Sequence, residues 1–309
     1  MNNTIPLVSI NCITYNHEKY IRQCLEGFIS QKTNFSFEIL IHDDASTDNT
    51  AQIIREYQKI YPDIIIPILQ KENQYSKGID IWTTYQYPRA RGKYIAICEG
   101  DDYWTNPYKL QKQVDILQNN NNISMCMHNV STFDGNSYKQ FYNYTKTEYK
   151  TADLIKNWIV PTCSVLFNKS AIHDFADENI KKYINQDYLL FTHISLKGSI
   201  YCINENMGVY RIHPGGMTSS LLKTTNSQKI FLEQIKYMIN RYPEIEKLLK
   251  IQYTETCTML LFVALSNRQY NYSFTLLKKA ISSNFLKFFT KASKLIYNKI
   301  ANSTRKACC

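Results

Sequence analysis

The chain has 309 residues, of which 44% are hydrophobic, so it can bury a substantial core and is not a disordered chain. Its formal net charge of +10 is typical of a protein that binds nucleic acid or a membrane, but nine of its 36 Lys and Arg residues follow Glu255, the last acidic residue. Residues 1–255 contain the other 27 and all 26 Asp and Glu residues. This main body is therefore close to neutral and offers no extended cationic surface. We therefore expect no nucleic-acid partner.

The first 120 residues predict strands that alternate with helices. Residues 7–13 form an apolar, β-rich run typical of a parallel sheet, and apolar residues recur at helical spacing over residues 21–29. Asn16 is the expected N-cap of that helix, and Ser46 or Thr47 that of the next. Further strands are expected at residues 37–41, 64–69 and 93–98, with helices before Pro62 and from Pro107 onward. This order predicts an α/β sheet that binds ligands at the carboxyl ends of its strands.

The pattern becomes mixed from residue 123 and helical after about residue 225. Strands are expected at residues 123–128, 163–167, 199–203 and 207–210, and a helix over 186–196. We therefore predict one domain over residues 1–225 and a helical, basic C-terminal extension over residues 226–309.

The predicted location is the cytoplasm. The start of the chain lacks a signal-peptide pattern, and we expect no spanning helix because no stretch approaches about 18 apolar residues. The nine cysteines are scattered, without a CxxC pair or zinc-ligand spacing, and this indicates reduced thiols.

Polar clusters follow the first, second and fourth predicted strands, at residues 14–16, 43–46 and 99–102. Each cluster alone is typical of a helix cap or a turn. The third is more specific, because Glu99 and the Asp101-Asp102 pair would repel one another unless a cation were bound. Oxygen ligands favour Mg²⁺ or Mn²⁺, which often also bind a substrate's phosphates. We therefore predict a site for a metal-bound diphosphate; the alternative is an acidic turn that caps the following helix.

These residues resemble the inverting glycosyltransferases of family 2, which bind nucleotide sugars in a GT-A fold. The resemblance lies in residues 6–16, 41–50 and 91–102, in the family's order and spacing, followed by Pro107 and the Lys109-Leu110 pair. It is strong over roughly the first 120 residues, weaker to about residue 215, and absent from the tail. The resemblance implies a Rossmann-like, mostly parallel mixed sheet flanked by helices.

The resemblance also implies roles for individual side chains. The implied nucleotide-binding residues are Thr14, Tyr15, Asn16, Asp44, Glu99 and Asp101. Tyr15 would pack near the nucleobase, Asp44 would bind its imide edge, and Asp101 would hold the ribose. Asp102 would bind Mn²⁺ or Mg²⁺ directly with support from Glu99, where the family more often has an aspartate.

Two further positions lie in the weaker half of the resemblance. Asp187, preceded by Gln186, matches the aspartate of the family's Glu-Asp pair and is implied as the general base. An aspartate near a helix start is otherwise more often a dipole-favoured cap. His213, in a Tyr-Arg-x-His element, is implied as a metal ligand or diphosphate contact, and Arg211 would add positive charge near the phosphates. The alternative for His213 is a loop histidine without a role.

The implied activity is transfer of a sugar from a nucleotide diphosphate sugar, by default a UDP-sugar, to a hydroxyl of a glycan or lipid-linked acceptor. One displacement, with Asp187 as base, would invert the anomeric configuration. The resemblance points to cell-surface polysaccharide or lipopolysaccharide synthesis. Two alternatives stay open: a catalytically silent sugar-nucleotide-binding protein, which Gln186 favours, and a nucleotidyltransferase, which would release pyrophosphate.

The C-terminal tail predicts an amphipathic basic helix. Its apolar residues recur at helical spacing, with lysines on other faces: Phe285, Phe288, Phe289, Ala292, Leu295, Ile296 and Ile300. One interpretation is peripheral contact of residues 282–309 with the anionic inner face of the cell membrane. The other is packing of the apolar face on the core, with the lysines in solvent.

Overall fold

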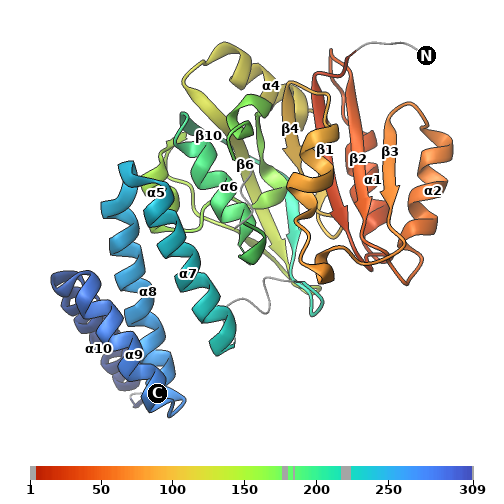
Figure 1. The fold of residues 1–309 in the computed structure, drawn as a ribbon. Coiled ribbons are helices and arrows are strands. Elements are labelled where there is room, and N and C mark those ends of the chain that lie inside the picture. Colours follow the sequence, from red (N-terminus) through yellow and green to blue (C-terminus); the bar gives the residue numbers. More distant parts are fainter. Residues whose placement is uncertain (1–4, 176–179, 184, 217–223, 308–309) are drawn as a thin grey trace. The chain divides into compact units, whose positions relative to one another are not determined.

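The computed structural model describes residues 5–175, 180–183, 185–216 and 224–307 (Figure 1). The chain forms two compact units, Met1–Ser219 and Ser220–Cys309.

The first unit begins with alternating strands and helices. Its first half contains β1 (Val8–Thr14), α1 (Ile21–Ile29), β2 (Phe37–Asp43), α2 (Thr50–Ile60), β3 (Ile65–Leu69), α3 (Tyr87–Arg89), β4 (Tyr94–Ile97), β5 (Tyr103–Trp104) and α4 (Lys109–Asn119). Its second half contains β6 (Ile123–Phe133), β7 (Tyr138–Gln140), β8 (Glu148–Tyr149), α5 (Thr151–Lys156), β9 (Leu166–Asn168), α6 (Gln186–Ser195) and β10 (Ser199–Arg211). The predicted α/β alternation is confirmed.

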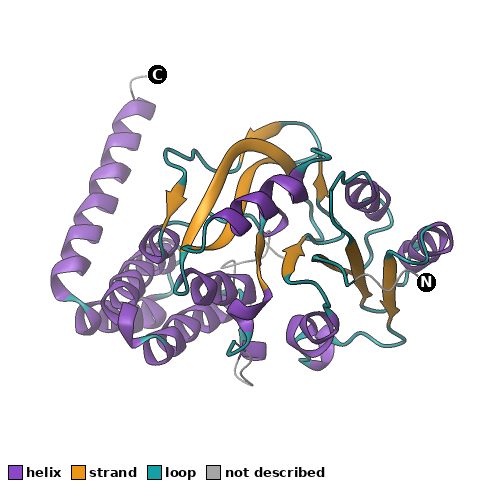
Figure 2. Ribbon diagram, turned by 90° about the horizontal axis from the view of Figure 1, so that it is seen from above, coloured by secondary structure: helices purple, strands orange, loops and turns teal. Residues whose placement is uncertain are grey.

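The strands form one mixed sheet in the order β3-β2-β1-β4-β9-β6-β10-β5, with β7 beside β6 and β8 beside β10. Strands β3, β2, β1 and β4 are parallel and lie side by side (Figure 1). Strand β9 runs antiparallel to β4 and β6, and β10 runs parallel to β6. Helices flank the strands of this unit (Figure 2). The fold is therefore the predicted GT-A type, a mixed sheet flanked by helices.

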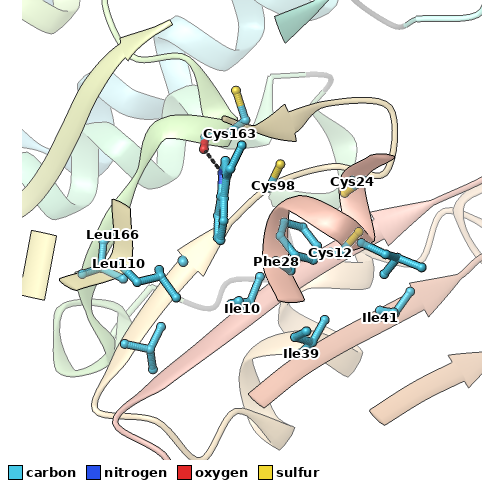
Figure 3. Close-up of a cluster of buried hydrophobic side chains, with 14 of the residues drawn as sticks. Ile10, Cys12, Cys24, Phe28, Ile39, Ile41, Cys98, Leu110, Cys163 and Leu166 are labelled. Carbon is cyan, nitrogen blue, oxygen red and sulfur yellow. Dashed lines mark hydrogen bonds between the residues drawn. The ribbon is translucent and has the colours of Figure 1, made fainter. Parts of the chain in front are cut away.

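The core explains why these segments form these elements. Strand β1 is buried along almost its whole length, as expected for a central strand covered on both faces. Helix α1 buries one face, and its Phe28 packs with Ile10 of β1 and with Ile39 and Ile41 of β2 (Figure 3). Each such side chain contributes roughly 1.5–3 kcal/mol on burial. This packing fixes the carboxyl ends of β1, β2 and β4 at one edge of the sheet.

The predicted helix caps are wrong. Asn16 does not cap α1; it adopts the left-handed conformation (φ 55°), and its Oδ1 accepts a hydrogen bond from the backbone N of Thr47 at 2.8 Å. Neither Ser46 nor Thr47 caps α2, because Asp48 Oδ1 accepts from the backbone N of Thr50 instead, at 2.9 Å. Asn16 thus joins the loops that follow β1 and β2.

Several predicted boundaries also differ. The strands expected at 199–203 and 207–210 are one strand, β10, whose pairing with β6 is irregular between Ile203 and Asn206. The strand expected at 163–167 begins only at Leu166, because residues 162–164 form a 3₁₀ turn. Helix α4 begins at Lys109 rather than at Pro107.

The second unit is helical, as predicted. It contains α7 (Thr225–Arg241), α8 (Glu246–Ser266), α9 (Tyr270–Ser283) and α10 (Phe285–Ala307). Its core is formed by apolar residues of all four helices, including Leu232, Ile235, Cys257, Leu276 and Phe288. The C-terminal extension therefore has a hydrophobic core of its own.

Among the described residues, one helix is long and apolar enough to cross a membrane by length and composition, Pro243–Ser266, so the expectation of no such helix is wrong by this criterion. Half of its most apolar window is buried in the protein. Leu249, Cys257 and Leu260 of this helix are buried. Cys257 and Leu260 belong to the hydrophobic core of the second unit, and a helix at the core of a protein outside a membrane can meet the same criterion.

Candidate active site

The three polar clusters meet at one edge of the sheet. Strands β1 and β2 end at Thr14 and Asp43, and the backbone N of Asp44 donates to the Thr14 carbonyl at 3.0 Å. Beyond β4, the backbone N of Gly100 donates to the Ile13 carbonyl at 2.9 Å. A side chain at position 100 would bring a Cβ to 2.6 Å from Thr14 Oγ1, so glycine lets the carboxylate loop lie against the end of β1. The buried Thr14 Oγ1 has no hydrogen-bond partner among the described residues.

Glu99, Asp101 and Asp102 form a tight cluster, with one carboxylate oxygen of each lying within 4.8 Å of the others. Burial and the neighbouring charge of Asp101 raise the pKa of Asp102 well above its usual value. Burial, together with the charges of Asp101 and Asp187, raises the pKa of Glu99 to about 8. Such like charges are stabilised by a cation, and carboxylate oxygens suit a divalent ion.

Asp102 is 1% exposed. Its Oδ1 accepts a hydrogen bond from the backbone N of Arg211 at 2.8 Å, whereas its Oδ2 is buried without a partner in the described part of the chain. An unpartnered buried carboxylate oxygen is costly unless it binds a ligand. The donor set at this edge therefore fits a divalent cation.

Asp101 faces two histidines. Its Oδ2 lies 3.0 Å from His213 Nε2 and 3.8 Å from His17 Nε2. Burial alone would raise the pKa of Asp101, but the hydrogen bond from His213 and the charge of His17 bring that pKa below its usual value. The structure thus places His213 at the carboxylate cluster. His17 also lies at this cluster. Its sequence pattern did not indicate this position, although His17 directly follows the Thr14-Tyr15-Asn16 cluster.

Asp187 lies at the start of α6, where its Oδ1 accepts from the backbone N of Tyr188 at 2.8 Å and its Oδ2 from Thr162 Oγ1 at 3.4 Å. Burial raises the pKa of Asp187 to about 6. The charge of Asp187 also raises the pKa of Glu99, so the two carboxyl groups are neighbours. A carboxylate with a pKa close to neutrality is suited to accept a proton.

The nucleobase side of the site contains Tyr15 and Asp44. Tyr15 is 44% exposed at the end of β1, so its ring is free to pack on a ligand. Asp44 is buried, and its carboxylate accepts from the backbone N of Gln74 at 2.7 Å and of Tyr75 at 3.0 Å. Asp44 therefore holds the 73–77 segment beside the ends of β1 and β2, while a carboxylate keeps further lone pairs for a ligand.

Arg211 ends β10 and is held by protein contacts. Its guanidinium lies 4.3 Å from the ring centre of Tyr103 and 5.0 Å from that of Tyr20, and it donates to the Asp101 carbonyl and to Gln23 Oε1. These contacts fix the start of the loop that carries His213.

Known proteins resemble this chain in sequence and fold. The family described as Glycosyl transferase family 2 matches residues 9–175. An uncharacterized protein of Mycobacterium tuberculosis, Rv1520, is 37% identical over 219 residues, which are 69% of this chain and 61% of that relative, so the chain spans about three fifths of the relative's length. The UDP-Glc:alpha-D-GlcNAc-diphosphoundecaprenol beta-1,3-glucosyltransferase WfaP of Escherichia coli is 29% identical over 243 residues, 75% of this chain and 87% of that protein. The crystal structure of S. aureus TarS with UDP-GlcNAc aligns with a TM-score of 0.64 at 17% identity, over 94% of this chain and 92% of that one, and so supports the fold.

Proposed function

The chain belongs to glycosyl transferase family 2, and from that premise we propose that it transfers a sugar from a UDP-sugar to a hydroxyl of a glycan or lipid-linked acceptor, with inversion. The observation that carries the proposal is the meeting of Asp102, His213 and Asp187 at one sheet edge. The TarS structure is a complex with UDP-GlcNAc, and the name of WfaP states that it transfers glucose from UDP-Glc. The proposed donor is therefore a UDP-hexose or UDP-N-acetylhexosamine, and the setting is assembly of a cell-surface polysaccharide.

The donor's nucleotide is proposed to bind along the ends of β1 and β2. Thr14 and Asn16 line the approach, the exposed Tyr15 ring packs on the base, and Asp44 accepts the imide N–H of uracil. Asp101 is the proposed ribose contact, and Glu99 supports the carboxylate loop. These positions orient the diphosphate toward the carboxylate cluster.

The cluster fits Mn²⁺ or Mg²⁺, with Asp102 as a ligand through its unpartnered Oδ2 and His213 as a second ligand. When bound, the ion would supply positive charge to the departing diphosphate. Asp187 accepts the proton of the acceptor hydroxyl as that oxygen attacks the anomeric carbon from the face opposite the leaving group. Because no second nucleophile takes part, an α-linked donor gives a β-linked product.

A panel of nucleotide sugars tests the donor. We expect one UDP-sugar to bind in the presence of Mn²⁺, measured by calorimetry, and to be slowly hydrolysed to UDP. GDP-, CMP- and dTDP-sugars serve as controls. Binding of a donor without turnover over a broad acceptor panel would favour the silent-binder alternative, and release of pyrophosphate would favour the nucleotidyltransferase.

Helix α10 is proposed to contact an anionic membrane surface. Its Phe288 is buried in the second unit, whereas Leu286 is 78% exposed and Phe289 is 51% exposed. No acidic residue follows Glu255 in the sequence, so all charged side chains of this helix are basic. Exposed apolar side chains among lysines are typical of a helix that lies in a lipid interface. WfaP acts on a lipid-linked acceptor, as its name states, and membrane contact would suit an acceptor of that kind.

Flotation with vesicles tests the membrane contact. The wild type is expected to float with vesicles that contain phosphatidylglycerol and not with purely zwitterionic ones. The double change Leu286→Ser and Phe289→Ser should weaken binding at least about tenfold, because two apolar side chains no longer enter the lipid. Val263→Ser, at an exposed position of α8, is the matched control. Equal flotation of the double variant and the wild type would refute the contact.

A further inference from the structure

We infer that His17 is a third cation ligand, and that together with Asp101 and His213 it makes the site select Mn²⁺ over Mg²⁺. The inference rests on the proposed function and deepens it, because it names the ion and moves Asp101 from the ribose to the cation.

The geometry comes from two segments that are far apart in the sequence. His17 lies in the loop after β1, and His213 lies just beyond β10. One ligand atom each from His17, Asp101 and His213 lies within 4.8 Å of the other two. The two imidazole rings are perpendicular, with centroids 6.2 Å apart, and both Nε2 atoms face the same Asp101 oxygen. A single ion can replace that shared contact and bind all three residues.

The backbone holds His17 in place without help from its ring. The backbone N of His17 donates to the buried Thr50 Oγ1 at 2.8 Å, and that of Glu18 donates to Asp48 Oδ2 at 3.0 Å. A Cβ at position 100 would lie 3.1 Å from His17 Nδ1, so Gly100 makes room for the ring. The ligand is therefore preorganised, as an ion site requires.

An independent observation points to a cation at the same place. Asp102 belongs to the second group of possible ligands that contains Asp101, and its buried Oδ2 has no partner in the described part of the chain. An ion beside Asp101 would satisfy that oxygen as well. The side chains of His17 and His213 are only 16% and 14% exposed, so they are screened from water but remain reachable.

The donor chemistry decides between the two candidate ions. Mg²⁺ prefers oxygen ligands and keeps several waters. Mn²⁺ binds imidazole less strongly than the later transition-metal ions do, but it accepts nitrogen ligands more readily than Mg²⁺ does. A site with one histidine beside several carboxylates discriminates only weakly between Mg²⁺ and Mn²⁺. Two histidines beside the carboxylates of Asp101 and Asp102 shift the preference from Mg²⁺ toward Mn²⁺.

Pulsed electron paramagnetic resonance of bound Mn²⁺ tests the inference, with and without UDP. We expect two coordinated imidazole nitrogens in the wild type, one in His17→Gln, and two in His173→Gln, an exposed histidine away from the cluster. The dissociation constant for Mn²⁺ should rise at least about tenfold in His17→Gln, since even the loss of a supporting residue costs a metal site that much. The constant for Mg²⁺ should change less than about threefold, so the preference for Mn²⁺ collapses.

The wild-type spectrum needs no variant and keeps the test decisive if His17→Gln does not fold. One coordinated nitrogen or none in the wild type overturns the inference, as do two nitrogens in His17→Gln. A Mn²⁺ site with His213 alone would leave the proposed function standing and refute only the role of His17. Two nitrogens in a protein that transfers no sugar from any donor would support the ion site and refute the proposed function instead.

Discussion

Replacing Asp187 with asparagine is expected to lower the rate of sugar transfer by about 10²- to 10⁴-fold, the usual contribution of a general base. The amide keeps the shape of the side chain and can still accept from the backbone N of Tyr188, so α6 should remain intact. UDP binding should stay within about threefold of the wild type, because Asp187 acts on the acceptor. Transfer assays and calorimetry separate the two effects, with Asp63→Asn on an exposed turn as the matched control.

The same residue predicts a pH profile. Burial raises the pKa of Asp187 to about 6, and only the deprotonated form accepts a proton. The value of kcat/KM should therefore fall as the pH drops through about 6 and be level above about pH 7. A profile that is unchanged in Asp187→Asn apart from a small uniform loss would contradict the base assignment.

Asp102→Asn is expected to abolish Mn²⁺-dependent UDP binding and to lower transfer more than about 100-fold, because the site loses a charged ligand next to the diphosphate. The folded protein should lose no stability. Burial and the charge of Asp101 raise the pKa of Asp102 in the folded protein. At pH 7, which is above the usual pKa of an aspartate, the ionised carboxylate is therefore less favourable in the folded chain than in the unfolded chain. A neutral amide removes this penalty.

Thermal unfolding without metal checks the second half of this prediction. The melting temperature of Asp102→Asn should equal or exceed that of the wild type, since Asn Oδ1 can still accept from the backbone N of Arg211. Asp153→Asn, at a half-buried carboxylate paired with Lys146, is the control and should not gain stability. Full metal-dependent UDP binding by Asp102→Asn would remove Asp102 from the proposed site.

The sequence predicts a helix or strand correctly where the hydrophobic pattern of that element alone decides its structure. The continuous apolar run of β1 and the helical spacing of α1 are local signals, and both elements form as predicted. The polar residues between Ile203 and Met207 break the apolar run, so the sequence predicts two strands there. In the structure they are one strand, β10, because its pairing with β6 continues through an irregular register.

The candidate site also combines features that the sequence predicts with features that it does not predict. The carboxylate loop after β4 was predictable because the ends of parallel strands share one edge. Three other features depend on contacts between segments that are far apart in the sequence. Asn16 accepts a hydrogen bond from Thr47, the Arg211 guanidinium lies near the rings of Tyr20 and Tyr103, and His17 lies near Asp101. No spacing in the sequence encodes those contacts, so only the folded chain reveals them.

The anomeric configuration of the first-formed product tests the central claim most directly, because it follows from a single displacement assisted by Asp187 and does not require a known acceptor. The UDP-sugar that binds best is incubated with the protein and Mn²⁺, and the released sugar is followed by NMR before it mutarotates. We predict UDP and a sugar of β configuration from an α-linked donor. A product that retains the α configuration, or release of pyrophosphate in place of UDP, would contradict the proposed mechanism.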